Sequence, residues 1–154
     1  MDRGYRSVQN IKLVTINFFG TSTTYLYLAF DRDDSTSWQS SAHSDSTTSF
    51  EIKIDLPSKI LINPTSIFVR TQHEGSSSTT EKHAKIMGYN PLIDNWEELG
   101  KIVGHASATN TTVTITNNVF YSKFKFVMYR YTSMKKYNLV YEFQITSGTL
   151  RKEN

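Results

Sequence analysis

The stretch SFEIKIDL, from Ser49 to Leu56, alternates between polar and apolar residues at every position. Successive side chains of a β-strand point to opposite faces, so this alternation predicts a strand with one face in a core and the other in water. The apolar face would consist of Phe50, Ile52, Ile54 and Leu56, and the charged face of Glu51, Lys53 and Asp55.

The same alternation recurs along the chain. TTVTITN sets Val113 and Ile115 inward, and FYSKFKFVMYRY sets Phe124 and Phe126 on the face opposite Tyr121. Further strand candidates lie at 10–19, 23–30, 65–72, 82–90 and 138–145. About eight strands separated by polar turns predict an all-β antiparallel sandwich or barrel. Only IDNWEELGKI, residues 93–102, is a candidate for a helical turn.

Composition sets the limits within which a function can be sought. The 154 residues suit one domain, which we expect to run from residue 1 to residue 154. The absence of cysteine excludes a disulfide framework, a thiolate metal site and a cysteine nucleophile. The net charge of +3 is small and scattered, which does not favour a nucleic-acid partner. No stretch approaches the ~18 apolar residues of a membrane span, and the N-terminus lacks the pattern of a signal peptide.

Four segments, taken in order, resemble one known domain family. They are AFDRDDSTSW (29–38), FEIKIDLPSKILINPTSIFVRT (50–71), KHAKIMGYNPLIDNWEELGKI (82–102) and YSKFKFVMYRYTSMKKYNLVYEFQITSG (121–148). Together they resemble the discoidin-like, coagulation factor V/VIII C-type domain, whose relatives include many carbohydrate-binding modules. The resemblance extends from about Tyr25 to Gly148. It implies a galactose-binding-like antiparallel sandwich, or jelly roll.

The oxygen-rich stretch AFDRDDSTSWQSS, residues 29–41, is open to two interpretations. Calcium takes six to eight oxygen ligands, and the resemblance implies a structural calcium at this motif. Carried over position by position, its ligands would be Asp31, Asp33, Thr36 and Glu142. The alternative is that the aspartates and hydroxyls cap the turn by hydrogen bonds to local backbone groups. Trp38 is expected to pack in the core under either interpretation.

The resemblance also implies a carbohydrate site in the loops at one end of the sandwich. Sugars are bound by aromatic faces and by planar polar groups, so loop residues of these types are the candidates. RTQHEG is the most suggestive segment, because an Arg, a His and a Glu within five residues could contact vicinal hydroxyls. The predicted ligand-binding residues are His43, Arg70, His73, Glu74, Tyr89 and Asn90. We expect Trp96 to belong to the core and not to the binding surface.

Other chemistries find little support in the sequence. The four histidines lack a metal-ligand spacing, and no glycine-rich phosphate loop or Gly-x-Ser-x-Gly motif occurs. The neighbouring Glu97 and Glu98 are not the facing carboxylate pair of a glycosidase. The chain is therefore not expected to be an enzyme. The basic and aromatic YSKFKFVMYRY is better explained as a half-buried strand than as a nucleic-acid surface.

Two functions from different classes remain. The leading interpretation is a non-catalytic, lectin-like module that binds a carbohydrate or glycoprotein, as in adhesion. The alternative is a structural or assembly subunit that uses the same fold for contacts with other protein subunits, in a virion, a fibre or an intracellular complex. We expect no membrane insertion. The expected location is extracellular or on a virion surface, with an intracellular complex as the alternative.

Overall fold

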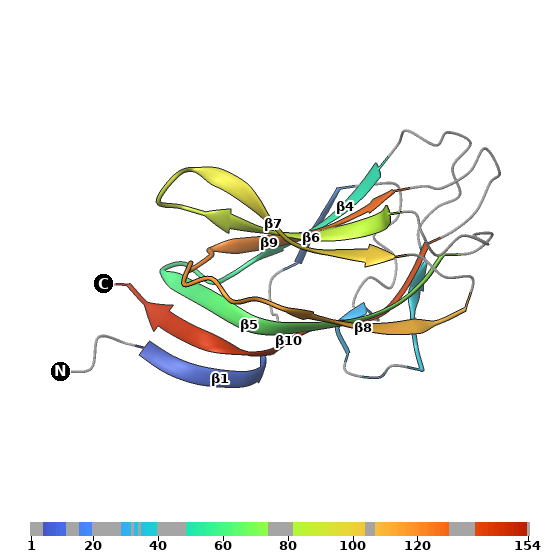
Figure 1. Ribbon diagram of the computed structural model, residues 1–154, viewed down its shortest axis with the longest axis horizontal. Coiled ribbons are helices and arrows are strands. Elements are labelled where there is room, and N and C mark those ends of the chain that lie inside the picture. The colour runs from blue at the N-terminus through green and yellow to red at the C-terminus, as the bar shows by residue number, and fades with distance from the viewer. Residues whose placement is uncertain are drawn as a thin grey trace.

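The computed structural model describes residues 5–11, 16–19, 29–31, 33, 35–39, 49–73, 82–103, 107–129 and 138–153. These residues form ten strands (Figure 1). The strands are β1 Tyr5–Ile11, β2 Ile16–Phe19, β3 Trp38–Gln39, β4 Ser49–Asp55, β5 Ile60–His73, β6 Lys82–Asn90, β7 Asn95–Val103, β8 Thr109–Thr114, β9 Lys123–Tyr129 and β10 Asn138–Lys152. The predicted all-β class is confirmed.

The strands form two five-stranded sheets that face one another as the layers of a sandwich (Figure 1). One sheet has the order β1-β10-β5-β8, with β3 paired to β10, and the other has the order β2-β4-β9-β6-β7. All of these pairings are antiparallel. The antiparallel sandwich is therefore confirmed, with more strands in the described residues than the eight expected.

Three regions account for the difference in strand number, one of them being the unexpected two-residue strand β3. The run 10–19 was expected to be one strand, but it contributes to β1, which pairs with β10, and to β2, which pairs with β4 in the other sheet. Residues 93–102 were a candidate for a helical turn, and this expectation is wrong for the part that begins at residue 95. It forms β7, because Asn95 and Trp96 pair with Asn90 and Tyr89 in a hairpin with β6. The candidate strand at 23–30 lies largely outside the described residues.

The core between the sheets follows the predicted alternation. Ile52 and Ile54 of β4 are 1% and 0% exposed, and Phe124 and Phe126 of β9 are equally buried. Val113 and Ile115 also point inward, as predicted. Trp38 belongs to this core. Burial of each large apolar side chain stabilises the fold by roughly 1.5–3 kcal/mol, so this core is the main source of stability.

Tyr121 is a second correction, because the alternation placed it on the outer face. It is fully buried instead. The alternation of β9 begins only at Lys123, and Tyr121 precedes it in an isolated bridge with Ile62 of the opposite sheet. The two residues exchange backbone hydrogen bonds of 2.8 and 3.0 Å. In a segment that crosses between the sheets, side chains do not follow the inward and outward alternation of either sheet.

The long pairing of β5 with β10 defines the two ends of the molecule. Asn138 pairs with His73 at one end, and Lys152 pairs with Ile60 at the other. We call the first the loop end, since the connections that follow β5 and β9 leave from it. We call the second the terminal end, because β10 finishes there beside the start of β1 (Figure 1). The described residues include no helix long and apolar enough to cross a membrane.

Candidate functional site

The oxygen-rich turn lies beside β10, in a gap between two strands. β1 pairs with β10 as far as Ile145, and β3 pairs with it from Val140. Trp38 pairs with Val140, and continuing this antiparallel register by two residues would place Thr36 opposite Glu142. The Glu142 side chain is buried, with 3% of the residue exposed. This continued register would bring the turn beside the distant glutamate that the resemblance implied.

Within the turn, three oxygens of different kinds converge. The Thr36 hydroxyl donates to Asp31 Oδ2 at 2.6 Å and lies 3.0 Å from the Asp33 carbonyl oxygen. Asp31 Oδ1 accepts the Asp33 N–H, and Asp33 Oδ1 accepts both the N–H and the hydroxyl of Ser35. The Ser35 hydroxyl, followed by its N–H, lowers the pKa of the Asp33 carboxyl. These bonds are the plain turn chemistry of the second interpretation.

The same donors have the chemistry that a calcium ion requires, since carboxylate, carbonyl and hydroxyl oxygens are its usual ligands. However, the described residues contain no group of three or more acidic or histidine side chains arranged for a metal ion. Both aspartates are exposed and bonded within the turn. A calcium at this position remains a prediction.

Arg70 is held in place near the loop end by its neighbours on the adjacent strands. Its Nη1 donates to Asn110 Oδ1 of β8 at 2.8 Å, and its guanidinium carbon lies 5.4 Å from the centre of the Tyr141 ring of β10. The Tyr141 hydroxyl in turn donates to Gln72 Oε1 at 2.8 Å. Because Val69 is buried, its neighbour Arg70 lies on the outer face of this sheet. The cluster combines a planar cation, an aromatic ring and two amides.

The predicted ligand-binding residues do not all meet at one end of the molecule. Arg70 lies near the loop end, and His73 is the last residue of β5 at that end. His43 and Glu74 lie outside the described residues. Tyr89 and Asn90, at the end of β6, instead lie at the terminal end. Their contact with a ligand is a prediction, but they cannot share one site with Arg70.

Trp96 is not the core residue that was expected. It is only partly buried, on the edge strand β7, and its ring stands edge-on to Tyr89 with the centres 5.4 Å apart. Lys125 Nζ lies 4.4 Å from the centre of the Trp96 ring and 3.4 Å from Glu51 Oε1. Tyr89 donates a hydrogen bond to Asp94. Trp96 fails to enter the core because the hairpin register aligns it with Tyr89, which faces outward.

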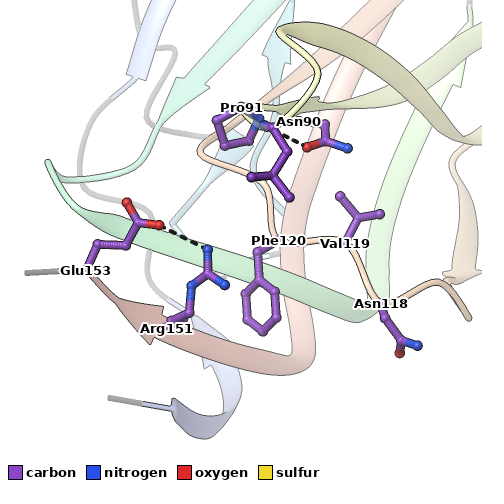
Figure 2. Close-up of a pocket in the computed structure, with 8 residues that line it drawn as sticks. Asn90, Pro91, Asn118, Val119, Phe120, Arg151 and Glu153 are labelled. Carbon is purple, nitrogen blue, oxygen red and sulfur yellow. Dashed lines mark hydrogen bonds and ion pairs between the residues drawn. The ribbon is translucent and has the colours of Figure 1, made fainter. Parts of the chain in front are cut away.

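A pocket at the terminal end, which we call the terminal pocket, was missed by the sequence analysis except for one residue. Its volume is about 420 Å³. Figure 2 shows its walls, which come from the β6–β7 turn, the segment before β9 and the end of β10. The lining residues are Asn90, Pro91, Leu92, Asn118, Val119, Phe120, Arg151 and Glu153.

A hydrogen-bonded network supports the terminal pocket from behind. Glu97 accepts hydrogen bonds from Asn90 Nδ2 at 3.0 Å and from the Tyr121 hydroxyl at 2.7 Å. The Asn90 bond, followed by the Tyr121 bond, lowers the pKa of the Glu97 carboxyl. Burial, followed by the bond to Glu97, raises the pKa of Tyr121. Asn117 Nδ2 donates to the same hydroxyl at 2.9 Å.

The network continues across the sandwich through Asn63, which is 8% exposed. Its Nδ2 donates to the Val119 carbonyl oxygen at 2.7 Å and lies 3.2 Å from both oxygens of Asn117. Buried amides of this kind stabilise a fold only when they are hydrogen-bonded. The segment 117–121 is therefore fixed on both sides, although it forms no strand of its own.

Comparison with known proteins gives the fold and not a family. No protein-family model matches the chain, and no curated protein matches it in sequence. The CBM32-6 module of Clostridium perfringens matches with a TM-score of 0.59 and 11% identity, covering 96% of this chain and 97% of that one. Chitosan-binding module 1 of a Paenibacillus sp. IK-5 chitosanase/glucanase matches with a TM-score of 0.59 and 15% identity, covering 89% and 98%.

A third match is the CBM32-5 module of Clostridium perfringens, solved in complex with GalNAc-β-1,3-galactose. Its TM-score is 0.52 at 12% identity, and the match covers 92% of this chain and 93% of that one. Likeness at such low identity shows the fold alone. The chain has the galactose-binding-like antiparallel sandwich that is shared by these carbohydrate-binding modules.

Proposed function

We propose that this chain is a non-catalytic module that binds carbohydrate at its loop end. The observation that carries the proposal is the fold, which matches several carbohydrate-binding modules over about nine-tenths or more of both chains. One of those modules is described with a bound disaccharide and another as binding chitosan. Fold alone transfers function poorly, so the chemistry of the loop end must supply the rest of the argument.

The Arg70 cluster has the chemistry of a sugar site. Asn110 and Tyr141 fix the guanidinium in one orientation, so little rotational freedom is lost when it donates to a hydroxyl. His73 follows three residues later, at the point where β5 enters the connection that contains Glu74. We propose that His43 joins them from the connection before β4. Glycans are displayed outside cells and on particle surfaces, so this function would place the chain there.

A glycan-array screen of the purified chain tests the proposal, once with calcium and once with a chelator. We expect binding to a defined group of glycans that Arg70→Ala and His73→Ala both abolish. Lys101→Ala is the matched control, because it removes an exposed cation from the edge strand of the other sheet. A folded protein that binds no glycan, or variants that bind as well as the parent, would reject the loop-end site.

A second candidate function, protein–protein assembly, is favoured by one observation. Leu92 and Ile93 at the tip of the β6–β7 turn are 87% and 59% exposed, although both are large and apolar. Contiguous exposed apolar surface marks contacts with other proteins when the patch is large enough, and this turn tip is the place where such a patch would form. Light scattering after size-exclusion chromatography checks this alternative. An assembly subunit should form an oligomer that Ile93→Ser weakens, whereas a monomer at all concentrations would speak against self-association.

A further inference from the structure

We propose that the terminal pocket is a second binding site, which takes one neutral sugar residue. It lies at the end of the sandwich opposite the Arg70 cluster, so it is not part of the loop-end site. The inference goes beyond the proposed function, because the terminal pocket could bind whether or not the loop end does. It rests on the shape, the charge and the rigidity of the described residues.

The shape is that of a small-molecule site. Ligand pockets in proteins usually have volumes of roughly 300–1,000 Å³, and the terminal pocket, at about 420 Å³, lies in the lower part of this range. Its walls come from three segments that are distant in sequence, around Pro91, Val119 and Arg151. Figure 2 shows Arg151 and Phe120 side by side, with Pro91 across from them. The size suits a single ring better than a long chain.

The polar groups of the terminal pocket suit a pair of neighbouring hydroxyls. Arg151 Nη2 lies 3.0 Å from Glu153 Oε1, and the guanidinium carbon lies 4.7 Å from the centre of the Phe120 ring. The guanidinium offers donors and the carboxylate offers acceptors, side by side. In a vicinal diol, one hydroxyl can donate a hydrogen bond to the carboxylate while the other accepts one from the guanidinium. The side chain of Arg151 is 25% exposed and that of Glu153 is 52% exposed, so both remain accessible.

The charge of the terminal pocket selects a neutral ligand. Arg151 and Glu153 neutralise each other, and the other lining residues carry no charge. An acidic sugar would have to displace Glu153 from the guanidinium, so its charge would not make it bind more tightly than a neutral sugar. A neutral ring also offers C–H groups to the apolar wall, which includes Leu92 and Val119. This contact would give the exposed Leu92 side chain a role.

The terminal pocket is rigid before any ligand arrives. Asn90 bonds to Glu97 through Nδ2 and accepts the Leu92 N–H through Oδ1 at 3.0 Å, which fixes the turn. Val119 is fixed from the other side, since its N–H donates to Asn117 Oδ1 and its carbonyl accepts from Asn63. A site that is already ordered loses less entropy on binding. Preorganisation matters most for a small ligand such as a single sugar, because its few contacts supply little binding energy to offset ordering of the site.

Two sites at opposite ends would allow one chain to bind two separate glycans. β10 runs from the loop end to the terminal end over 15 residues. Arg70 pairs with Glu142, nine residues before Arg151 on β10, so at about 3.4 Å per residue the two sites would lie roughly 30 Å apart. One short oligosaccharide could not fill both, so a chain with both sites occupied would link two glycans.

The test is an NMR titration of the isotopically labelled chain with galactose, N-acetylgalactosamine, glucose and N-acetylglucosamine, and with glucuronic acid as the acidic comparison. We expect at least one neutral sugar at millimolar concentration to shift the signals of residues 118–120 and 151–153. Arg151→Ala should weaken this binding about tenfold or more, equivalent to 1.4 kcal/mol. Lys152→Ala is the matched control, because the neighbouring side chain is exposed and does not line the terminal pocket.

Three results would overturn the proposal. They are the absence of shifts at residues 118–120 and 151–153 with every neutral sugar, a response to glucuronic acid alone, and equal weakening by Lys152→Ala and Arg151→Ala. Arg70→Ala separates this site from the loop-end site. It should leave the shifts at the terminal pocket unchanged, even if it abolishes binding on the glycan array. Failure of one site would therefore not be mistaken for failure of the other.

Discussion

The Tyr121 hydroxyl donates a hydrogen bond of 2.7 Å to Glu97 Oε2, while it accepts one of 2.9 Å from Asn117. This phenol joins strand β7 of one sheet to a segment whose backbone is bonded to Ile62 of the other sheet. The Tyr121 ring is fully buried and stands edge-on to Phe124. One side chain therefore belongs both to the apolar core and to the polar network behind the terminal pocket.

Tyr121→Phe should lower the free energy of unfolding by about 1–3 kcal/mol, the usual cost of removing a hydrogen bond to a charged group. The ring would still fill its place in the core, so the loss would come from Glu97 and Asn117. Urea unfolding of the two proteins measures it. Tyr141→Phe is the control, since its hydroxyl bonds to the neutral Gln72 on the outer face. Equal losses in the two variants would contradict a special role for Tyr121.

Stability should also fall in acid, because Glu97 has a lowered pKa in the folded protein. A carboxyl with a lowered folded pKa contributes stability above its unfolded pKa, near 4.5, and loses that contribution as the pH falls through the folded value. Urea unfolding between neutral pH and about pH 3 should therefore show a decline that is smaller in Glu97→Gln. An unchanged pH dependence in Glu97→Gln would show that other carboxyls are responsible.

Gly88 lies against the face of the Tyr121 ring, and this contact explains why a strand tolerates a glycine here. A Cβ at position 88 would lie 2.6 Å from Tyr121 Cδ1 and 2.9 Å from Cε1. The ring has no free space to move into, because it is fully buried. Gly88→Ala should destabilise the protein by about 1–3 kcal/mol, as overpacked cores do. Thermal unfolding checks this, and a melting temperature equal to that of the parent would mean that the ring can shift without cost.

The fold was predictable because its main signals are local. Alternation within β4 and β9 is enough to identify Ile52, Ile54, Phe124 and Phe126 as buried, since the period of a strand is visible over a few residues. β7 was not predictable in this way. Its residues depend on pairing with β6, and the outward position of Trp96 follows from the register of that hairpin.

The terminal pocket could not be predicted for a related reason. It joins residues near positions 91, 119 and 151, which only the complete fold brings together. Arg151 also lies beyond Gly148, where the resemblance ends. The predicted ligand residues were chosen by type and by position in loops, which cannot show to which end a loop belongs. Asn90 was thus predicted to share a ligand with Arg70, although the two residues lie at opposite ends of the sandwich.

Calcium should stabilise the protein if the turn at Asp31 is a metal site closed by Glu142. Binding at a hundredfold excess over Kd would add about 2.7 kcal/mol, which in a chain of this size raises Tm by roughly 5–10 °C. Differential scanning fluorimetry with calcium, with a chelator and with magnesium measures this directly. The oxygens around the Thr36 hydroxyl could bind a cation, or they could only form the hydrogen bonds of the turn. Variants of the acidic residues distinguish these two roles.

Glu142→Gln is the informative variant, because Glu142 is a buried carboxylate and the resemblance implies that it closes the calcium site from β10. A calcium site predicts that Glu142→Gln removes the response to calcium. Glu153→Gln, a carboxylate at the terminal end, should retain that response. If the parent protein melts at the same temperature in calcium and in chelator, the aspartates serve the turn alone. In that case Asp33→Asn should still lower Tm, because the amide accepts the Ser35 bonds less strongly than the carboxylate.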